Sequence, residues 1–276
     1  MTTVLLILLT LFLILVVLWL FAMRTSTSKH RYEEIMTKQI YAHRGLHDGG
    51  QNIPENTLEA FSAAIQKGYG IELDVHISAD QTPVVIHDTN LLDTTGLEAD
   101  INEVSDNEIK LQKTGAKRCK IPFLYEALNL VNGKVPLLIE IKTDKDNYEK
   151  VTDATMQVLE NYKGVYAIQS FDPRVIKILR KKYPDVMRGQ ISGYLNEEGA
   201  NLPFSQDFAL RNLLTNMVTR PDFVSYRIED FDKLPMRILR TVFNPTLFAW
   251  TIRDNSGFRK CRLVNAAPVF DEMKFR

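Results

Sequence analysis

Apolar residues first form one long uninterrupted segment at the start of the chain. Val4–Met23 carries no charged side chain and a single threonine. Roughly 20 apolar residues are enough to cross a bilayer as a helix. The alternative is a cleaved signal peptide, whose apolar core is usually about 7–15 residues, follows positive charge and precedes a small-residue cleavage site. Because the segment has none of these features, the pattern favours a retained transmembrane anchor over residues 1–23.

The charges on either side of this segment predict its orientation. Met1-Thr2-Thr3 carries no Lys or Arg, whereas basic residues follow the segment at Arg24, Lys29, Arg31 and Lys38. An excess of Lys and Arg marks the cytoplasmic side of a membrane helix. We therefore expect a single-pass protein of the cell membrane with the rest of the chain in the cytoplasm. Residues 24–38 are polar and are predicted to be a linker.

Short apolar runs alternate with helical patterns over residues 39–276. The predicted strands are Gln39–His43, Gly70–Ile77, Thr82–His87, Val135–Lys142, Val165–Gln169, Val186–Gly189, Phe223–Tyr226, Leu247–Ile252 and Pro268–Phe270. The predicted helices include Thr57–Lys67, Tyr148–Tyr162, Pro173–Lys182, Phe204–Leu214 and Leu234–Thr241. Strands that alternate with helices form βαβ units and a parallel sheet. Eight or nine such strands favour an α/β fold of the TIM-type (β/α)8 barrel class, as one domain. The irregular stretch Thr89–Lys120 is expected to be a long loop with one short helix at the functional end of the barrel.

Composition narrows the range of partners. The chain has 34 basic and 34 acidic residues, so its net charge gives no electrostatic case for nucleic acid. Cys119 and Cys261 lie far apart without metal-binding spacing, and they do not indicate a disulfide framework.

Two of the predicted strands carry acids on one face. Strand side chains alternate, so Glu72, Asp74 and His76 share the face opposite Ile71, Leu73, Val75 and Ile77. On Val135–Lys142 the same alternation puts Glu140 and Lys142 together. Buried carboxylates need a partner. We predict a metal site for Mg²⁺ or Ca²⁺, which prefer oxygen ligands. The alternative is a structural salt bridge to Arg44 or Lys142.

Two histidines end predicted strands. His43 or His87 alone is typical of a core histidine, but two at the carboxyl ends of barrel strands indicate an active site. Histidine suits general acid or base work near neutral pH. The guanidinium of Arg44 matches phosphate oxygens. Glu55 and Asn56 precede a helix, so they are either capping residues or part of the site. The role of His76 stays open.

These residues together resemble the glycerophosphodiester phosphodiesterase family. The ordered motifs are His43-Arg44-Gly45, Pro54-Glu55-Asn56-Thr57, Glu72-Leu73-Asp74, His87-Asp88 and Glu140-Ile141-Lys142, with later agreement at Gln169-Ser170-Phe171-Asp172, Trp250-Thr251-Ile252 and Phe270-Asp271. The resemblance implies that Glu72, Asp74 and Glu140 bind the metal and that His43 and His87 are the acid–base pair. It further implies contacts to phosphate, glycerol or metal from Arg44, Glu55 and Lys142, and a pocket wall formed by Phe171 and Trp250.

The chain departs from the family at Asp80-Gln81-Thr82 and at Asp93. A short loop after His87 is expected to leave the cleft open.

The implied activity is hydrolysis of glycerophosphodiesters to glycerol 3-phosphate, or a related phosphomonoester, and an alcohol. A tethered barrel lies close to lipids, so lysophospholipid-type diesters are a second expected substrate class. A membrane-tethered binding module or inactive barrel is the alternative, although neither a metal ligand nor a histidine of the pattern is missing. A different metal-dependent barrel hydrolase, such as a deacetylase or an amidohydrolase, would need more histidine ligands than a chain with five histidines supplies.

Overall fold

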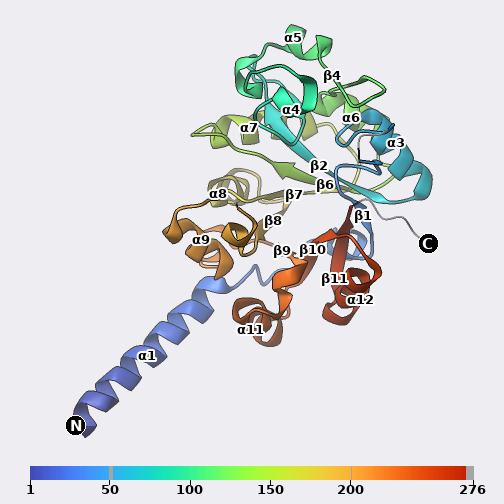
Figure 1. Ribbon diagram of the computed structural model, residues 1–276. Coiled ribbons are helices and arrows are strands. Elements are labelled where there is room, and N and C mark those ends of the chain that lie inside the picture. The colour runs from blue at the N-terminus through green and yellow to red at the C-terminus, as the bar shows by residue number, and fades with distance from the viewer. Residues whose placement is uncertain (50–51, 200, 272–276) are drawn as a thin grey trace.

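A parallel β-barrel forms the body of the protein. The computed structural model describes residues 1–49, 52–199 and 201–271. Within these residues the barrel strands are β1 (Tyr41–Ala42), β2 (Gly70–Ile77), β6 (Leu137–Ile141), β7 (Tyr166–Ser170), β8 (Met187–Ser192), β9 (Phe223–Arg227), β10 (Thr246–Ile252) and β11 (Ala266–Phe270). Each strand pairs in parallel with its neighbours, and β1 pairs with both β11 and β2, which closes the barrel (Figure 1). The predicted (β/α)8 barrel is confirmed.

Helices cover the outside of the barrel. They are α3 (Leu58–Lys67), α6 (Leu124–Val131), α7 (Tyr148–Leu159), α8 (Pro173–Lys182), α9 (Phe204–Arg211), α10 (Asn216–Thr219), α11 (Leu234–Phe243) and α12 (Asn255–Val264), with 3-10 turns at η2 (Leu195–Glu198) and η3 (Ile228–Asp232). Local signals fix their ends. In α3 the Thr57 hydroxyl accepts a hydrogen bond from the Ala60 amide, and Gly68 ends the helix with φ +70°.

Strand alternation gives the barrel two apolar layers. Leu73 and Ile139 point outward into the large cluster beneath the helices. Tyr41, Leu138 and Phe248 point inward and fill the amino-terminal half of the barrel. The predicted division of β2 and β6 into an apolar face and a polar face is therefore confirmed, and the polar side chains occupy the opposite half of the interior.

The segment predicted to be a linker contains a short helix. α2 (Glu33–Thr37) places Met36 in the inner apolar cluster, and the Tyr41 hydroxyl donates to the Met36 carbonyl at 3.0 Å. Residues 24–38 thus close the amino-terminal end of the barrel. Five residues are too few to show helical periodicity, so only this packing reveals the helix.

The prediction that Thr82–His87 is a parallel barrel strand is wrong. β3 (Pro83–Val85) pairs antiparallel with β2, with Val85 opposite Val75. The Ile86 amide donates to the Asp74 carbonyl at 3.1 Å, so the hairpin brings His87 back over the carboxyl end of the barrel. His87 reaches the predicted place by this return and not by ending a barrel strand.

The chain after His87 forms a compact insertion. It comprises α4 (Leu92–Thr95), η1 (Ile101–Glu103), α5 (Asp106–Leu111), β4 (Lys113–Thr114) and β5 (Cys119–Lys120). Its own apolar cluster includes Leu91, Ile109 and Phe123, and Figure 1 shows it rising above β2. The long irregular stretch expected over Thr89–Lys120 is therefore present, but it contains two α-helices instead of one and packs around its own apolar residues. The expectation of a short loop after His87 is wrong.

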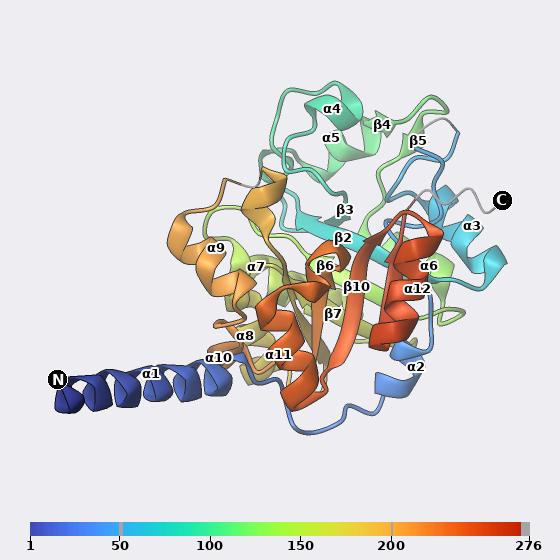
Figure 2. The same ribbon diagram turned by 60° about the horizontal axis from the view of Figure 1, so that its bottom comes forward.

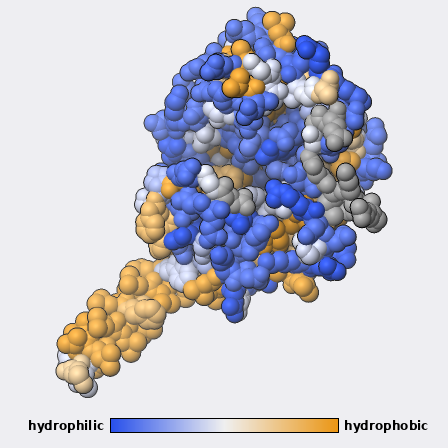
Figure 3. Space-filling view, viewed as in Figure 1, coloured by the Kyte–Doolittle hydropathy of each residue, from blue (hydrophilic) through white to orange (hydrophobic). Residues whose placement is uncertain are grey.

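The amino-terminal helix projects away from the barrel. α1 (Thr2–Met23) has a mean hydropathy of 3.3 over its most apolar window, which lies outside the packed interior, and is a candidate membrane span. Figure 3 shows it as a hydrophobic rod beside a mostly hydrophilic body. Its carboxyl-terminal end packs on the barrel: Met23 is buried, its carbonyl accepts from the Asn216 amide group at 2.9 Å, and the Trp19 indole donates to the Asn212 carbonyl at 3.1 Å.

Candidate active site

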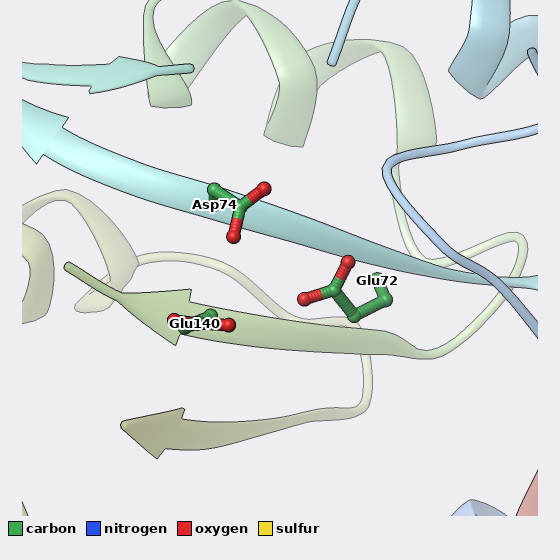
Figure 4. A group of neighbouring side chains, drawn as sticks. All are labelled: Glu72, Asp74 and Glu140. Atoms are coloured by element: carbon green, nitrogen blue, oxygen red, sulfur yellow. The ribbon is translucent and has the colours of Figure 1, made fainter. Parts of the chain in front are cut away.

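Three carboxylates meet inside the carboxyl-terminal half of the barrel. Asp74 on β2 lies opposite Glu140 on β6, and Glu72 lies one inward position before Asp74. One carboxylate oxygen from each residue lies within 4.8 Å of the others, and all three side chains are buried. Figure 4 shows the three groups turned toward one another between the two strands. The arrangement that alternation predicted for these acids is the one observed.

The three carboxylates carry more negative charge than their neighbours neutralise. Burial raises the pKa of Glu72 well above its usual range, and the charges of Asp74 and Glu140 raise it further. Burial also raises the pKa of Glu140, although Lys142 opposes this. Asp74 differs, because Lys142 and Arg44 outweigh its burial and lower its pKa. Two cations thus face three acids, which is the condition for binding a further cation.

Lys142 lies beside the acids on the same strand face. Its Nζ is 2.8 Å from Glu140 Oε1 and 3.3 Å from Asp74 Oδ1. Burial alone would lower its pKa, but Asp74 and Glu140 raise the pKa above the usual range and keep the amine charged. The salt bridges that were the alternative to a metal site are therefore present, but they leave one carboxylate without a cation.

A tight turn after β1 brings Arg44 to the acids. Arg44 and Gly45 both have positive φ, and a Cβ on Gly45 would lie 2.8 Å from the Cβ of Ala60 on α3. Only glycine fits this approach without displacement. The turn lets the Arg44 amide donate to Glu72 at 3.1 Å and puts its Nε 3.4 Å from Asp74.

The residues before α3 divide between the helix and the site. Glu55 accepts from Arg44 Nη1 at 2.7 Å. The Asn56 amide group donates to Asp74 Oδ2 at 2.9 Å, and its oxygen accepts from the Asp74 amide at 3.3 Å. Thr57, not Asn56, caps the helix. Glu55 and Asn56 therefore both belong to the site rather than to the cap.

His43 stands at the rim of the acidic cluster. Its Nε2 is 4.0 Å from Glu72 Oε2, and its Nδ1 is 3.8 Å from Asp271 Oδ2. Asp271 also contacts His47 Nε2 at 2.7 Å. Burial lowers the pKa of His43, and Asp271 partly offsets this. His43 is thus placed between the buried acid Glu72 and the carboxylate of Asp271.

His87 faces the same cluster from the β3 side. Its Nδ1 lies 2.7 Å from Asp88 Oδ1, and Asp88 in turn accepts from the Thr94 hydroxyl at 3.2 Å. Burial lowers the pKa of His87, and Lys142 lowers it further.

His76 is buried, and its Nε2 contacts the His87 carbonyl at 3.1 Å. Burial lowers the pKa of His76 to about 4. His76 therefore supports the backbone of His87 as a neutral side chain.

Two aromatic residues form one wall of the mouth. The Phe171 and Trp250 rings meet edge to face with centroids 5.6 Å apart, and Lys142 Nζ is 5.9 Å from the Phe171 centroid. The structure thus gathers every predicted site residue at the carboxyl end of the barrel.

Several neighbours of this site did not figure among the predicted site residues. His47 contacts Asp271, and Gln169 donates from its amide nitrogen to Glu72 at 3.5 Å while its buried amide oxygen has no hydrogen-bond partner within the described chain. The motif at Gln169 was a signal for that residue. His47 had none, because a histidine in a loop carries no periodicity.

A closed α/β barrel with acids, histidines and cations at the carboxyl ends of its strands defines a barrel enzyme scaffold, and its buried acids are compatible with a hard metal ion. The sequence profile of the glycerophosphoryl diester phosphodiesterase family matches residues 43–273. The chain belongs to this family.

Two protein relatives illustrate the match. The glycerophosphodiester phosphodiesterase of Caldanaerobacter subterraneus is 33% identical over 164 residues, which span 56% of this chain and 66% of that protein. An uncharacterized protein of Mycoplasma genitalium is 34% identical over 232 residues, 80% of this chain and 89% of its own length. The chain therefore spans just under two thirds of the first relative.

Solved structures match the barrel more completely. An Oleispira antarctica phosphodiesterase, solved with its product sn-glycerol-3-phosphate, aligns with a TM-score of 0.69 and 25% identity over 85% of this chain and 92% of that chain. A Thermotoga maritima glycerophosphodiester phosphodiesterase aligns with a TM-score of 0.65 and 26% identity over 84% and 93%.

Proposed function

We propose that this protein is a glycerophosphodiester phosphodiesterase that hydrolyses its substrate to glycerol 3-phosphate and an alcohol. The observation that carries the proposal is the meeting of His43 and His87 on either side of the buried acids Glu72, Asp74 and Glu140. The names of the relatives and of the solved structures support the same activity.

A divalent cation, Mg²⁺ or Ca²⁺, fits the three carboxylates. The donors are all oxygens, the set lacks one positive charge, and burial excludes competing water. Glu72, Asp74 and Glu140 would hold the ion. When bound, it supplies charge stabilisation at a phosphoryl oxygen.

The chain's own cations complete the phosphate site. Arg44 and Lys142 remain charged and lie beside the acids at the mouth. Their donors offset negative charge that develops on the phosphate oxygens during hydrolysis. Glu55 holds the Arg44 guanidinium at 2.7 Å and so orients it.

The two histidines move the protons. One takes a proton from the nucleophile, which is water or the glycerol 2-hydroxyl, and the other donates a proton to the departing alcohol oxygen. Attack by water gives glycerol 3-phosphate directly, whereas attack by the 2-hydroxyl gives a cyclic glycerol phosphate that water must open in a second step. Each has a carboxylate near its Nδ1: Asp271 lies 3.8 Å from His43, and Asp88 contacts His87 at 2.7 Å and so orients it. Burial lowers the pKa of both rings, so a neutral base is available at neutral pH.

Retention of α1 as a membrane anchor, with the barrel on the cytoplasmic side, is the second part of the proposal. The hydrogen bonds from Asn216 to the Met23 carbonyl and from Trp19 to the Asn212 carbonyl favour a helix that remains attached to the barrel. A cleaved signal peptide would leave Asn216 without this partner.

An apolar groove beside the aromatic wall favours lysophospholipids as a second substrate class. The groove has a volume of about 780 Å³. It begins at Phe171 and Thr143 near Lys142 and continues along Ala209 and Leu210 of α9 to Thr215. Thr215 precedes Asn216, the residue bonded to the end of α1. The groove therefore leads from the catalytic mouth toward the membrane helix. Its lining also includes Asp172, Arg174, Ser205 and Gln206, but most of its surface is apolar, and an acyl chain fits it.

The test is a substrate panel offered to the full chain in phosphatidylcholine nanodiscs. Glycerophosphocholine, glycerophosphoethanolamine, glycerophosphoglycerol and lysophosphatidylcholine are each supplied with Mg²⁺, with Ca²⁺ and with EDTA. Metal-dependent release of a phosphomonoester from at least one of them supports the proposal. Release from none would favour a phosphodiester-binding barrel instead.

A further inference from the structure

A second polar cavity lies at the foot of α1, away from the catalytic mouth. Its volume is about 340 Å³, and it is lined by Arg24, Thr25, Ser26, Thr27, Arg180, Arg188 and Arg220. Arg188 lies near the start of β8, and Arg220 precedes β9. The cavity is therefore at the amino-terminal end of the barrel, opposite the acidic cluster.

The cavity begins where the hydrophobic helix ends. Arg220 Nη1 donates to the carbonyls of Phe21 and Arg24, both at 3.1 Å, and its guanidinium lies 4.7 Å from the centre of the Phe21 ring. Figure 2 shows α1 meeting the body of the protein beside α8 and α10. A membrane that contains α1 would thus place its head groups at the level of the cavity.

The four arginines converge from separate parts of the chain. Arg180 belongs to α8, Arg188 to β8 and Arg220 to the end of α10, whereas Arg24 follows α1. Charges that only fix membrane orientation need no such convergence, because they act from the flanking segment alone. The barrel itself builds this site.

The positive charge is poorly compensated. The acid in contact is Asp222, whose Oδ2 lies 3.4 Å from Arg188 Nη1. Arg188 is 8% exposed, and its Nε has no hydrogen-bond partner among the described residues. Burial and the neighbouring arginines lower the pKa values of Arg188 and Arg220. Guanidinium groups with mutual repulsion and an unused buried donor favour an anion with several acceptor oxygens.

We propose that this cavity binds the phosphate group of an anionic phospholipid. The lipid belongs to the leaflet that surrounds the carboxyl-terminal end of α1. The inference rests on the proposed membrane anchoring. Guanidinium groups bind phosphate through paired hydrogen bonds, and the polar residues Thr25, Ser26 and Thr27 line the same cavity. Basic pockets beside membrane helices are suited to acidic head groups. The bound lipid would fix the barrel against the bilayer surface.

Native mass spectrometry of the full chain tests the proposal. The protein is released from nanodiscs made of equal parts phosphatidylcholine and phosphatidylglycerol, and the fraction that keeps an anionic lipid is measured. The test variant is Arg24→Gln with Arg180→Gln, which spares the buried Arg188. The matched control is Lys29→Gln with Arg31→Gln, which removes the same charge from the neighbouring segment outside the cavity.

Wild type and control should retain one phosphatidylglycerol, whereas the test variant should retain it at least about tenfold less often. If the control loses phosphatidylglycerol as often as the test variant does, the lipid is held by general charge attraction and the proposed site is wrong. The proposed site is also wrong if the test variant retains phosphatidylglycerol as often as wild type does. Displacement of the lipid by millimolar inorganic phosphate would overturn the assignment to a lipid. The readout does not involve hydrolysis, so an inactive protein that shows this pattern refutes the proposed activity and not the lipid site. Unchanged thermal unfolding of the test variant confirms that it folds.

Discussion

Asp74 and Glu140 lie directly opposite each other in the parallel register of β2 and β6. Both side chains point into the barrel, and Lys142 contacts both, at 3.3 Å and 2.8 Å. Two acids on neighbouring strands are thus held face to face before any ligand arrives. The site is preorganised by the sheet itself.

Metal binding should stabilise the fold through the acidic cluster. A ligand that binds only the folded state at about 100 times its Kd adds about 2.7 kcal/mol, which corresponds to a rise in Tm of about 5–10 °C for a chain of this size. Mg²⁺ or Ca²⁺ should produce this rise in wild type and not in Glu140→Gln. Calorimetry measures it, with Asp153→Asn on α7 as a control that keeps the response. An equal rise in Glu140→Gln would rule out the predicted ligand set.

The two histidines should both be essential for turnover. His43→Ala and His87→Ala are each expected to lower kcat by about 10²–10⁴-fold, the usual contribution of a general acid or base. His30→Ala is the control, because His30 contacts the Asp185 carbonyl at the other end of the barrel. Steady-state kinetics at saturating metal give the comparison. Near-normal turnover in either site variant would refute the acid–base assignment.

Asp88 should set the pKa at which His87 titrates. The carboxylate raises the pKa of the imidazole through the 2.7 Å contact, so Asp88→Asn should lower that pKa. If His87 is the base, the acid limb of the pH–rate profile moves to lower pH. If it is the acid, the basic limb moves to lower pH. The profile of kcat/KM therefore assigns the role, and a profile with neither limb displaced means that His87 does not titrate in the reaction.

The apolar groove should matter only for lipid substrates. Ala209→Phe narrows the groove along α9 without touching the catalytic residues. We expect kcat/KM for lysophosphatidylcholine to fall by about 10-fold or more, since a displaced acyl chain loses about 0.8 kcal/mol per methylene. Glycerophosphocholine, which has no acyl chain, serves as the internal control. A parallel loss on both substrates would mean that the substitution distorts the barrel.

The acidic cluster was predictable because strand periodicity is local. Alternation placed Glu72, Asp74 and Glu140 on inward faces before any fold was known, and the closed barrel brought them together. The same reasoning failed at Thr82–His87. An apolar run of this length has the same pattern whether it is parallel or antiparallel to its neighbour, so the hairpin with β2 could not be read from it.

Other features depended on contacts between distant parts of the chain. Met36 closes the amino-terminal end of the barrel by packing in the inner apolar cluster. Its helix, α2, has five residues, which is too short for a helical pattern to be recognised in the sequence. The sequence left Asn56 open between a capping residue and a site residue, and its bond to Asp74 depends on the barrel that brings β2 beside it, while the next residue, Thr57, caps the helix. His47 meets Asp271 across more than two hundred residues, a pairing that no local pattern records.

The most direct test of the account is the product formed from glycerophosphocholine by the full chain. Phosphorus NMR follows the reaction with metal, with EDTA and in His43→Ala. We predict conversion to glycerol 3-phosphate and choline with metal, its loss in EDTA with recovery when metal is restored, and almost no conversion by His43→Ala. Undiminished conversion in EDTA, or phosphocholine and glycerol as the products, would contradict the account.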